Sequence, residues 1–266
     1  LIEMIKTMIA LAKMQFKQYN IYKSNFYLFT LNRIVEVIVY IFVWQAIYYQ
    51  TGDAGGFTIA EMTTYYILVI TFSPFALWGI NEDIAHSIRN GQINRELLNP
   101  ISYFKYYFGV NLGELTFAAV IGLATFIICS FFWQLVLPTN LINFILCIFI
   151  MLLGVPITFF IQMIVGTVRF YTSSIWGMQI LRKAIIQIFS GIIAPITLFP
   201  LWFQELSKWL PFKELIYTPV SIWLGNTQMN EIFFIIIKQI VWGIILYFIA
   251  RIFFNHAVKN ITINGG

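Results

Sequence analysis

Long apolar runs recur along this chain, and they constrain its fold more than any other feature. A membrane-crossing helix needs about 20 predominantly apolar residues, and in hydrocarbon only a helix or a closed barrel satisfies its backbone hydrogen bonds. Apolar residues make up 60% of the 266 positions and charged residues 10%, too little charge to cover the surface of a soluble domain. We expect an all-α membrane protein with six transmembrane helices, over residues 27–49, 59–80, 112–137, 141–168, 184–202 and 232–254.

Basic residues orient these spans. They fall before the first span, between alternate pairs of spans and after the last, where they comprise Lys6, Lys13, Lys17, Lys23, Arg89, Arg95, Lys105, Arg169, Arg182, Lys183, Arg251 and Lys259. The opposite loops hold only Lys208 and Lys213. Positive loops face the cytoplasm, so both termini are expected there. The basic residues form no cluster, which argues against a nucleic-acid partner.

We expect one domain over 1–266, with spans at 27–80, 106–202 and 231–254 and a cytoplasmic tail at 255–266. Three segments outside the spans have patterns that ordinary loops lack. Residues 1–26 carry Ile2, Ile5, Ile9, Ala12 and Phe16 at helical spacing, which predicts an amphipathic elbow helix lying in the membrane interface. Residues 81–105 form the longest cytoplasmic stretch. Residues 203–230 are too apolar for a solvated loop and are broken by prolines, which favours a short re-entrant segment on the extracellular side.

Two stretches carry a family resemblance: IRNGQINRELLNPIS at 88–102 and LFPLWFQELSKWLPFKELIYTPVSIWLG at 198–225. With the order of the segments, they resemble the ABC-2 type (type V) permeases of bacterial ABC exporters. The resemblance implies a multi-pass protein of the bacterial cytoplasmic membrane that pairs with a second copy or a related permease. It also implies ABC ATPase subunits as partners and an amphiphilic substrate such as a drug, lipid or peptide.

Residues 81–100 are the only cytoplasmic segment long and structured enough for a separate motor to push. We therefore assign coupling to the ATPase to Glu82, Asp83, Arg89, Gly91, Leu97, Leu98 and Pro100. The two acids also suit a helix start, Gly91 a break and Pro100 a stop, and the leucines either dock on the motor or pack against the bundle. The chain has no GxxxxGK[ST] phosphate loop, so ATP and Mg are expected on the partner ATPase, with no cofactor here.

Ionisable residues inside apolar spans are candidates for a functional polar site. Arg33 and Glu36 lie three residues apart on one helix, and Glu114 opens the third span. Their alternative roles are helix packing or a bridge between Arg33 and Glu114. His86 and His256 lack a second ligand at metal spacing, so we expect no metal site. Ser190-Gly191 lacks the leading Gly of a GxSG-type serine and no histidine lies within a span, so we expect no enzyme activity. An ion-driven secondary transporter and a non-transporting scaffold coupled to an ATPase remain alternatives.

Overall fold

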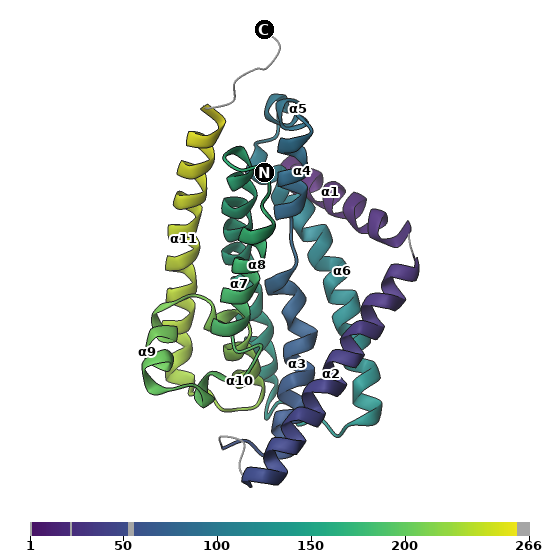
Figure 1. Cartoon of the computed structure of the whole chain (residues 1–266), viewed down its shortest axis with the longest axis vertical. Helices are drawn as coiled ribbons and strands as arrows, with labels where there is room; N and C mark the ends of the chain where they lie inside the picture. The colour runs from purple at the N-terminus through teal and green to yellow at the C-terminus, as the bar shows by residue number, and fades with distance from the viewer. Residues whose placement is uncertain (1, 22, 53–55, 260–266) are drawn as a thin grey trace.

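The computed structural model describes residues 2–21, 23–52 and 56–259, and every regular element in these ranges is a helix. Residues 260–266 of the expected tail lie outside the described ranges. Within these ranges, five helices are long and apolar enough to cross a membrane, counting α4 (Asn81–Arg89) as the continuation of α3. They are α2 (Lys23–Thr51), α3 (Ile59–Leu77), α6 (Tyr103–Phe132), α7 (Leu141–Thr167) and α11 (Met229–Lys259), and they run side by side in an upright bundle (Figure 1).

The long helices follow the sequence prediction closely, with one shift. Helices cover the expected ranges 27–49, 141–168 and 232–254 to within a few residues, and α3 covers 59–77. The third helix, expected at 112–137, instead begins at Tyr103 and ends at Phe132. It ends because Trp133 adopts an extended conformation, so Pro138 lies beyond the helix that we expected it to close. The earlier start includes Lys105, which we had placed in the preceding loop.

The expected fifth span at 184–202 is not one helix. Helix α8 runs from Trp176 to Phe189, and its 14 residues extend about 21 Å, short of a bilayer core. It ends in a turn at Gly191, whose φ of +84° favours glycine. Tyr65 of α3 fixes this turn, since its hydroxyl donates to the Gly191 carbonyl at 2.6 Å. The short 3-10 helix η2 (Ile196–Leu198) follows.

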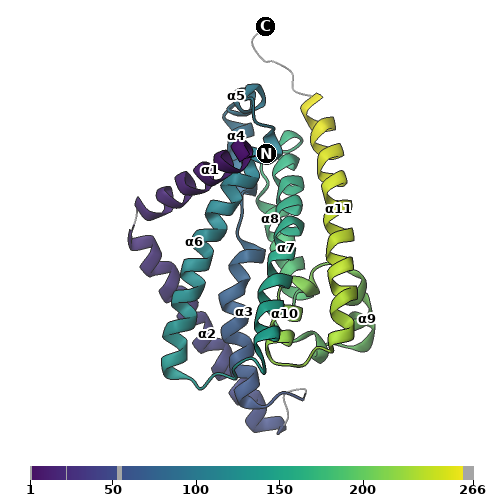
Figure 2. The same cartoon turned by 180° about the vertical axis from the view of Figure 1, so that it is seen from behind.

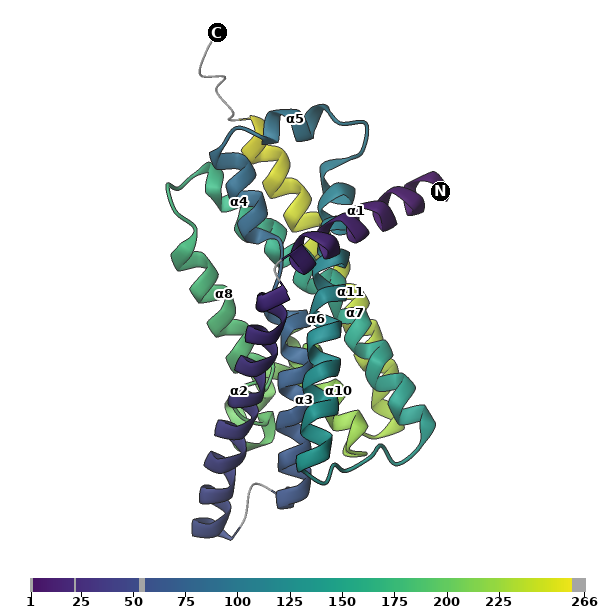
Figure 3. The same ribbon diagram turned by 90° about the vertical axis from the view of Figure 1, so that its right-hand side faces the viewer.

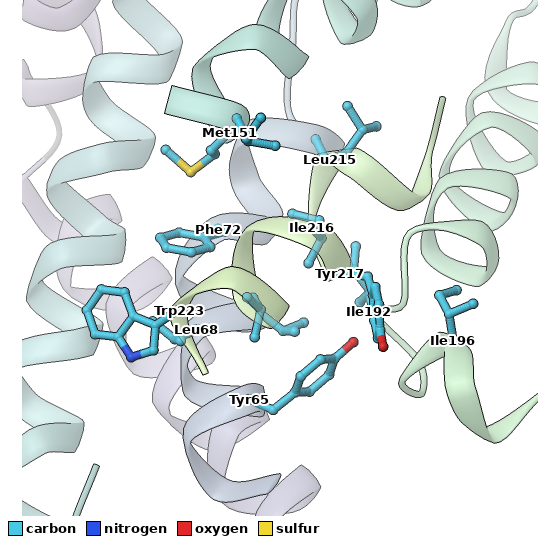
Figure 4. Packing of buried hydrophobic residues seen from close by; sticks show 14 of the residues in the cluster. Tyr65, Leu68, Phe72, Met151, Ile192, Ile196, Leu215, Ile216, Tyr217 and Trp223 are labelled. Carbon is cyan, nitrogen blue, oxygen red and sulfur yellow. The ribbon is translucent and has the colours of Figure 1, made fainter. Parts of the chain in front are cut away.

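Helix α3 lies at the centre of the molecule, and most of its side chains are buried. Its Tyr65, Leu68 and Phe72 pack against Met151 of α7 and against α10 (Tyr217–Trp223), as Figure 4 shows. All seven residues of α10 are buried. The apolar character of 203–230 is therefore explained by packing into the protein core, at least for this helix.

The segment before the last helix also contains α9 (Leu201–Trp209) and the 3-10 helix η3 (Lys213–Leu215). Three side chains of α11 fasten it. Lys238 Nζ lies 2.5 Å from Glu214 Oε1, Gln239 Nε2 donates to the Glu214 carbonyl, and Trp242 Nε1 donates to the Trp209 carbonyl at 2.9 Å. Glu214 is only 1% exposed, so its charge depends on this ion pair.

Helix α1 (Ile2–Ile21) crosses α6 near one end of the bundle (Figure 2). The approach is close because α6 carries glycine where the helices meet. A Cβ on Gly113 would lie 2.6 Å from the carbonyl oxygen of Ala12. At the same end α4 and α5 (Ile93–Leu98) project from the bundle, whereas α9 and α10 lie toward the opposite end (Figure 1).

Candidate functional site

The site begins at the break between α3 and α4. The Trp78 N–H still donates to the Pro74 carbonyl, but Trp78 itself is extended and ends α3. Gly79 follows with a φ of +149°, and α4 starts at Asn81. Backbone groups at a helix end lack partners within the helix, so a buried break needs partners from elsewhere.

Gln162 of α7 supplies two of these partners. Its Oε1 accepts from the Ile80 N–H at 2.9 Å, and its Nε2 donates to the Trp78 carbonyl at 2.8 Å. A Cβ on Gly79 would lie 1.7 Å from the same Oε1, so glycine leaves the space that the amide fills. The break is thereby tied to α7.

Arg182 of α8 satisfies the end of α3. Its Nη2 donates to the Leu77 carbonyl at 2.7 Å, and its Nη1 lies 3.5 Å from the Ala76 carbonyl. A cation at a helix C-terminus also interacts favourably with the helix dipole. Gln162 therefore ties the break between α3 and α4 to α7, and Arg182 ties the end of α3 to α8.

Sequence reasoning missed these connecting residues. Arg182 was interpreted only as an orientation signal, and neither Gly79 nor Gln162 was singled out. Gln162 offered a usable signal, because an amide inside an apolar span must find partners within the protein. Which partners it finds depends on tertiary packing.

The candidate intramembrane residues gather around Trp78. Arg33 Nη1 and Glu36 Oε2 lie 2.7 Å apart, so the expected pair forms on α2. The Arg33 guanidinium also lies over the Trp78 ring, 5.8 Å from its centre. Glu114 lines a cavity of about 360 Å³ beside Trp78, together with Glu82, Arg182 and Lys183.

One cavity joins the two sets of candidate residues. Glu82 at the start of α4 and Glu114 of α6 both line the cavity beside Trp78. The acidic start of α4 is thereby linked to the polar cluster of the bundle, which sequence reasoning had kept apart.

A second, larger cavity opens on the other side of α4. It measures about 510 Å³ and lies between α4 and residues 169–179, which include most of the 3-10 helix η1 (Val168–Phe170) and the start of α8. Glu82, Asp83 and Arg89 lie on one wall, and Arg169 and Trp176 lie on the other. Figure 3 shows α4 and α8 on the same side of the molecule. Arginines on both walls and Trp176 on one of them suit contact with a folded partner.

Helix α5 presents the predicted leucines. Leu98 is 85% exposed and Leu97 is 37% exposed, so within one chain Leu98 does not pack against the bundle. Gly91 forms the turn between α4 and α5 with a φ of +69°, and Pro100 follows α5. Glu96, another residue that sequence reasoning missed, holds this tip in place, because its Oε2 accepts from Ser87 at 2.7 Å and from Tyr107 at 3.0 Å.

Comparison with known proteins supplies one match. The model of a family described as ABC-2 family transporter protein matches residues 34–265, which include all of the helices from α3 to α11 and most of α2. A search of curated proteins found no match.

Proposed function

The chain belongs to the ABC-2 family of transporter proteins, and from this premise we propose that it is the membrane-spanning permease subunit of an ABC exporter. The observation that carries the proposal is the junction of α3 and α4, where Gln162 and Arg182 connect a projecting helix to the bundle. A permease moved by a separate ATPase needs such a connection. The two acidic residues of α4, Arg89 and the α5 tip would receive the push.

The proposed topology has six crossings with both termini in the cytoplasm of a bacterial inner membrane. Helix α8 and residues 190–200 would together form the fifth crossing, because α8 alone is too short. Helix α1 would be the interfacial elbow, and α9 to α10 the extracellular re-entrant segment. The basic residues near α4 and the start of α8 support this orientation.

The exposed surfaces support the partners that we propose. ABC ATPase subunits, which would bind ATP and Mg, dock at the cavity between α4 and α8 and on Leu98. A second permease, identical or related, would cover part of the apolar face of α2, where Leu31, Val35 and Phe42 are exposed. Membrane lipid would cover the rest. The exported substrate would be amphiphilic, like a drug, lipid or peptide.

Leu98→Ser tests the docking. An apolar side chain buried in a partner contributes about 1.5–3 kcal/mol, so this variant should lose most ATPase in a pull-down and most ATP-dependent export from vesicles. Glu82→Ala, at an exposed position, should lose much less. Leu201→Ser is the matched control, a leucine 78% exposed on α9 at the other end of the bundle, and it should keep full ATPase binding.

Full export by Leu98→Ser, with normal ATPase capture, would remove α5 from the coupling route. Export that persists without any ATPase subunit would instead support an ion-driven transporter. Normal ATPase capture without any transport would support a scaffold.

A further inference from the structure

Helix α1 crosses α6 on the face of the bundle seen in Figure 2. A groove lies beside this crossing. It measures about 680 Å³ and is bounded by α1, α6, α7 and one residue of α3. Its walls are apolar and include Ile9 and Phe16 of α1, Leu112 and Ala119 of α6, and Leu152 of α7. It lies apart from the cavities around α4, which are lined by other residues.

The groove has one basic residue in its lining. Lys13 is the only charged side chain among the described residues that line it. Lys6 and Lys17 lie seven residues before and four after Lys13, so the three exposed lysines share one side of α1. An occupant with a negative group beside α1 and an apolar body along α6 and α7 would match both features.

We propose that this groove binds an anionic glycerophospholipid, with its phosphate at Lys13 and an acyl chain against α6 and α7. The depth of the lining residues in the bilayer supports a bound lipid. Helix α1 meets the cytoplasmic half of α6 in the proposed topology, so its lysines lie at headgroup level and Leu152 lies deeper in the bilayer. The lipid would fill the space beside the α1–α6 contact and hold the elbow helix in place. The proposal uses the proposed orientation but does not depend on coupling to an ATPase.

Native mass spectrometry of the purified full chain tests the proposal. The protein is mixed with equal amounts of dioleoyl phosphatidylglycerol and dioleoyl phosphatidylcholine, and retained lipid is counted. We expect phosphatidylglycerol to be retained about fivefold better, the factor that corresponds to about 1 kcal/mol per basic residue near anionic lipid. Lys13→Ala should abolish that preference, whereas Lys105→Ala, an exposed lysine on α6 outside the groove, should keep it.

Blocking the groove separates a bound lipid from a surface charge effect. Ala119→Trp should reduce retention of both lipids severalfold, and Ala46→Trp, the same change at an exposed position on α2, should not. Glycerol phosphate in excess, which has the charge without the chains, should not displace the bound lipid. Equal retention of the two lipids by the unaltered chain, displacement by glycerol phosphate, or unchanged retention in Ala119→Trp would each overturn the proposal. None of these results depends on transport, so they stand apart from the test of Leu98.

Discussion

Gln162 and Gly79 act as a pair, because the amide of one occupies the space that the absent side chain of the other leaves open. This arrangement satisfies the backbone at a break in the middle of the buried core, where Ile80 is fully buried. It also restricts position 79 to glycine, since no larger residue fits there while Gln162 keeps its place. The backbone at the break between α3 and α4 therefore relies on one amide side chain for two of its hydrogen bonds.

Gln162→Ala should weaken the proposed coupling between α4 and the helix bundle. The variant leaves the Ile80 N–H and the Trp78 carbonyl without these partners, and each unpaired buried group costs about 1–3 kcal/mol. We expect the complex with its ATPase to keep hydrolysing ATP while export per ATP falls severalfold, measured together in proteoliposomes. Gln134→Ala, an exposed glutamine near the other end of α6, is the matched control and should keep the ratio. An unchanged ratio in Gln162→Ala would show that the junction does not transmit the movement.

Lys238→Ala should destabilise the protein in a pH-dependent way. Burial raises the pKa of Glu214 above its ordinary value of 4.5, and Lys238 opposes that rise. Without the lysine the buried carboxylate loses its ion pair, at a cost of about 3–5 kcal/mol. In the folded variant the Glu214 carboxyl then binds its proton more tightly than in the unfolded chain. The free energy of unfolding therefore falls as pH rises above the ordinary pKa of glutamate.

Thermal unfolding in detergent measures this effect. The gap between Lys238→Ala and the unaltered protein should be larger at about pH 8 than at about pH 5. Lys208→Ala, which removes an exposed ion pair with Glu205, should show little change at either pH. An equal difference in unfolding temperature at both pH values would mean that the pKa of Glu214 does not change on folding.

At the scale of elements, the sequence was sufficient for the helices with long and predominantly apolar runs, such as α7 and α11. It was insufficient where tertiary contacts decide the ends. The turn after α8 depends on Tyr65 reaching the Gly191 carbonyl from more than a hundred residues away, and no local pattern contains that information. The same holds for the site, where the acidic start of α4 was predicted but the support of the preceding backbone by Gln162 was not.

The contact between α1 and α6 can be tested with one methyl group. Gly113→Ala places a Cβ 2.6 Å from the Ala12 carbonyl oxygen, and such overpacking costs about 1–3 kcal/mol. We expect α1 to separate from α6 and trypsin to cleave after Lys13 and Lys17 severalfold faster. Gly243→Ala is the matched control, because it makes the same change inside α11 and its Cβ meets nothing within 4 Å. Equal cleavage rates in the two variants would mean that this contact does not hold α1.

At the scale of the whole molecule, its two ends differ in kind. The end with α4 and α5 has an open polar cavity and an exposed leucine, whereas the segment at the other end is fastened to α11 by three side chains. An ATPase partner needs the first kind of surface. The contacts with α11 hold the segment at the other end in a fixed shape.

The number of crossings decides whether these two ends face opposite sides of the membrane. Between Asn90 and Glu205 the chain passes through α6, α7 and the region of α8, so three crossings put the two residues on opposite sides and two crossings put them on the same side.

Both residues are exposed, and the native Cys129 and Cys147 are 0% exposed, so single introduced cysteines report cleanly. In intact cells a membrane-impermeant maleimide should label Glu205→Cys and spare Asn90→Cys and Lys13→Cys, and in inverted vesicles the pattern should reverse. Labelling of Asn90→Cys and Glu205→Cys from the same side would reduce the count to five and place the C-terminal end of α11 outside, because α8 alone does not reach across the bilayer.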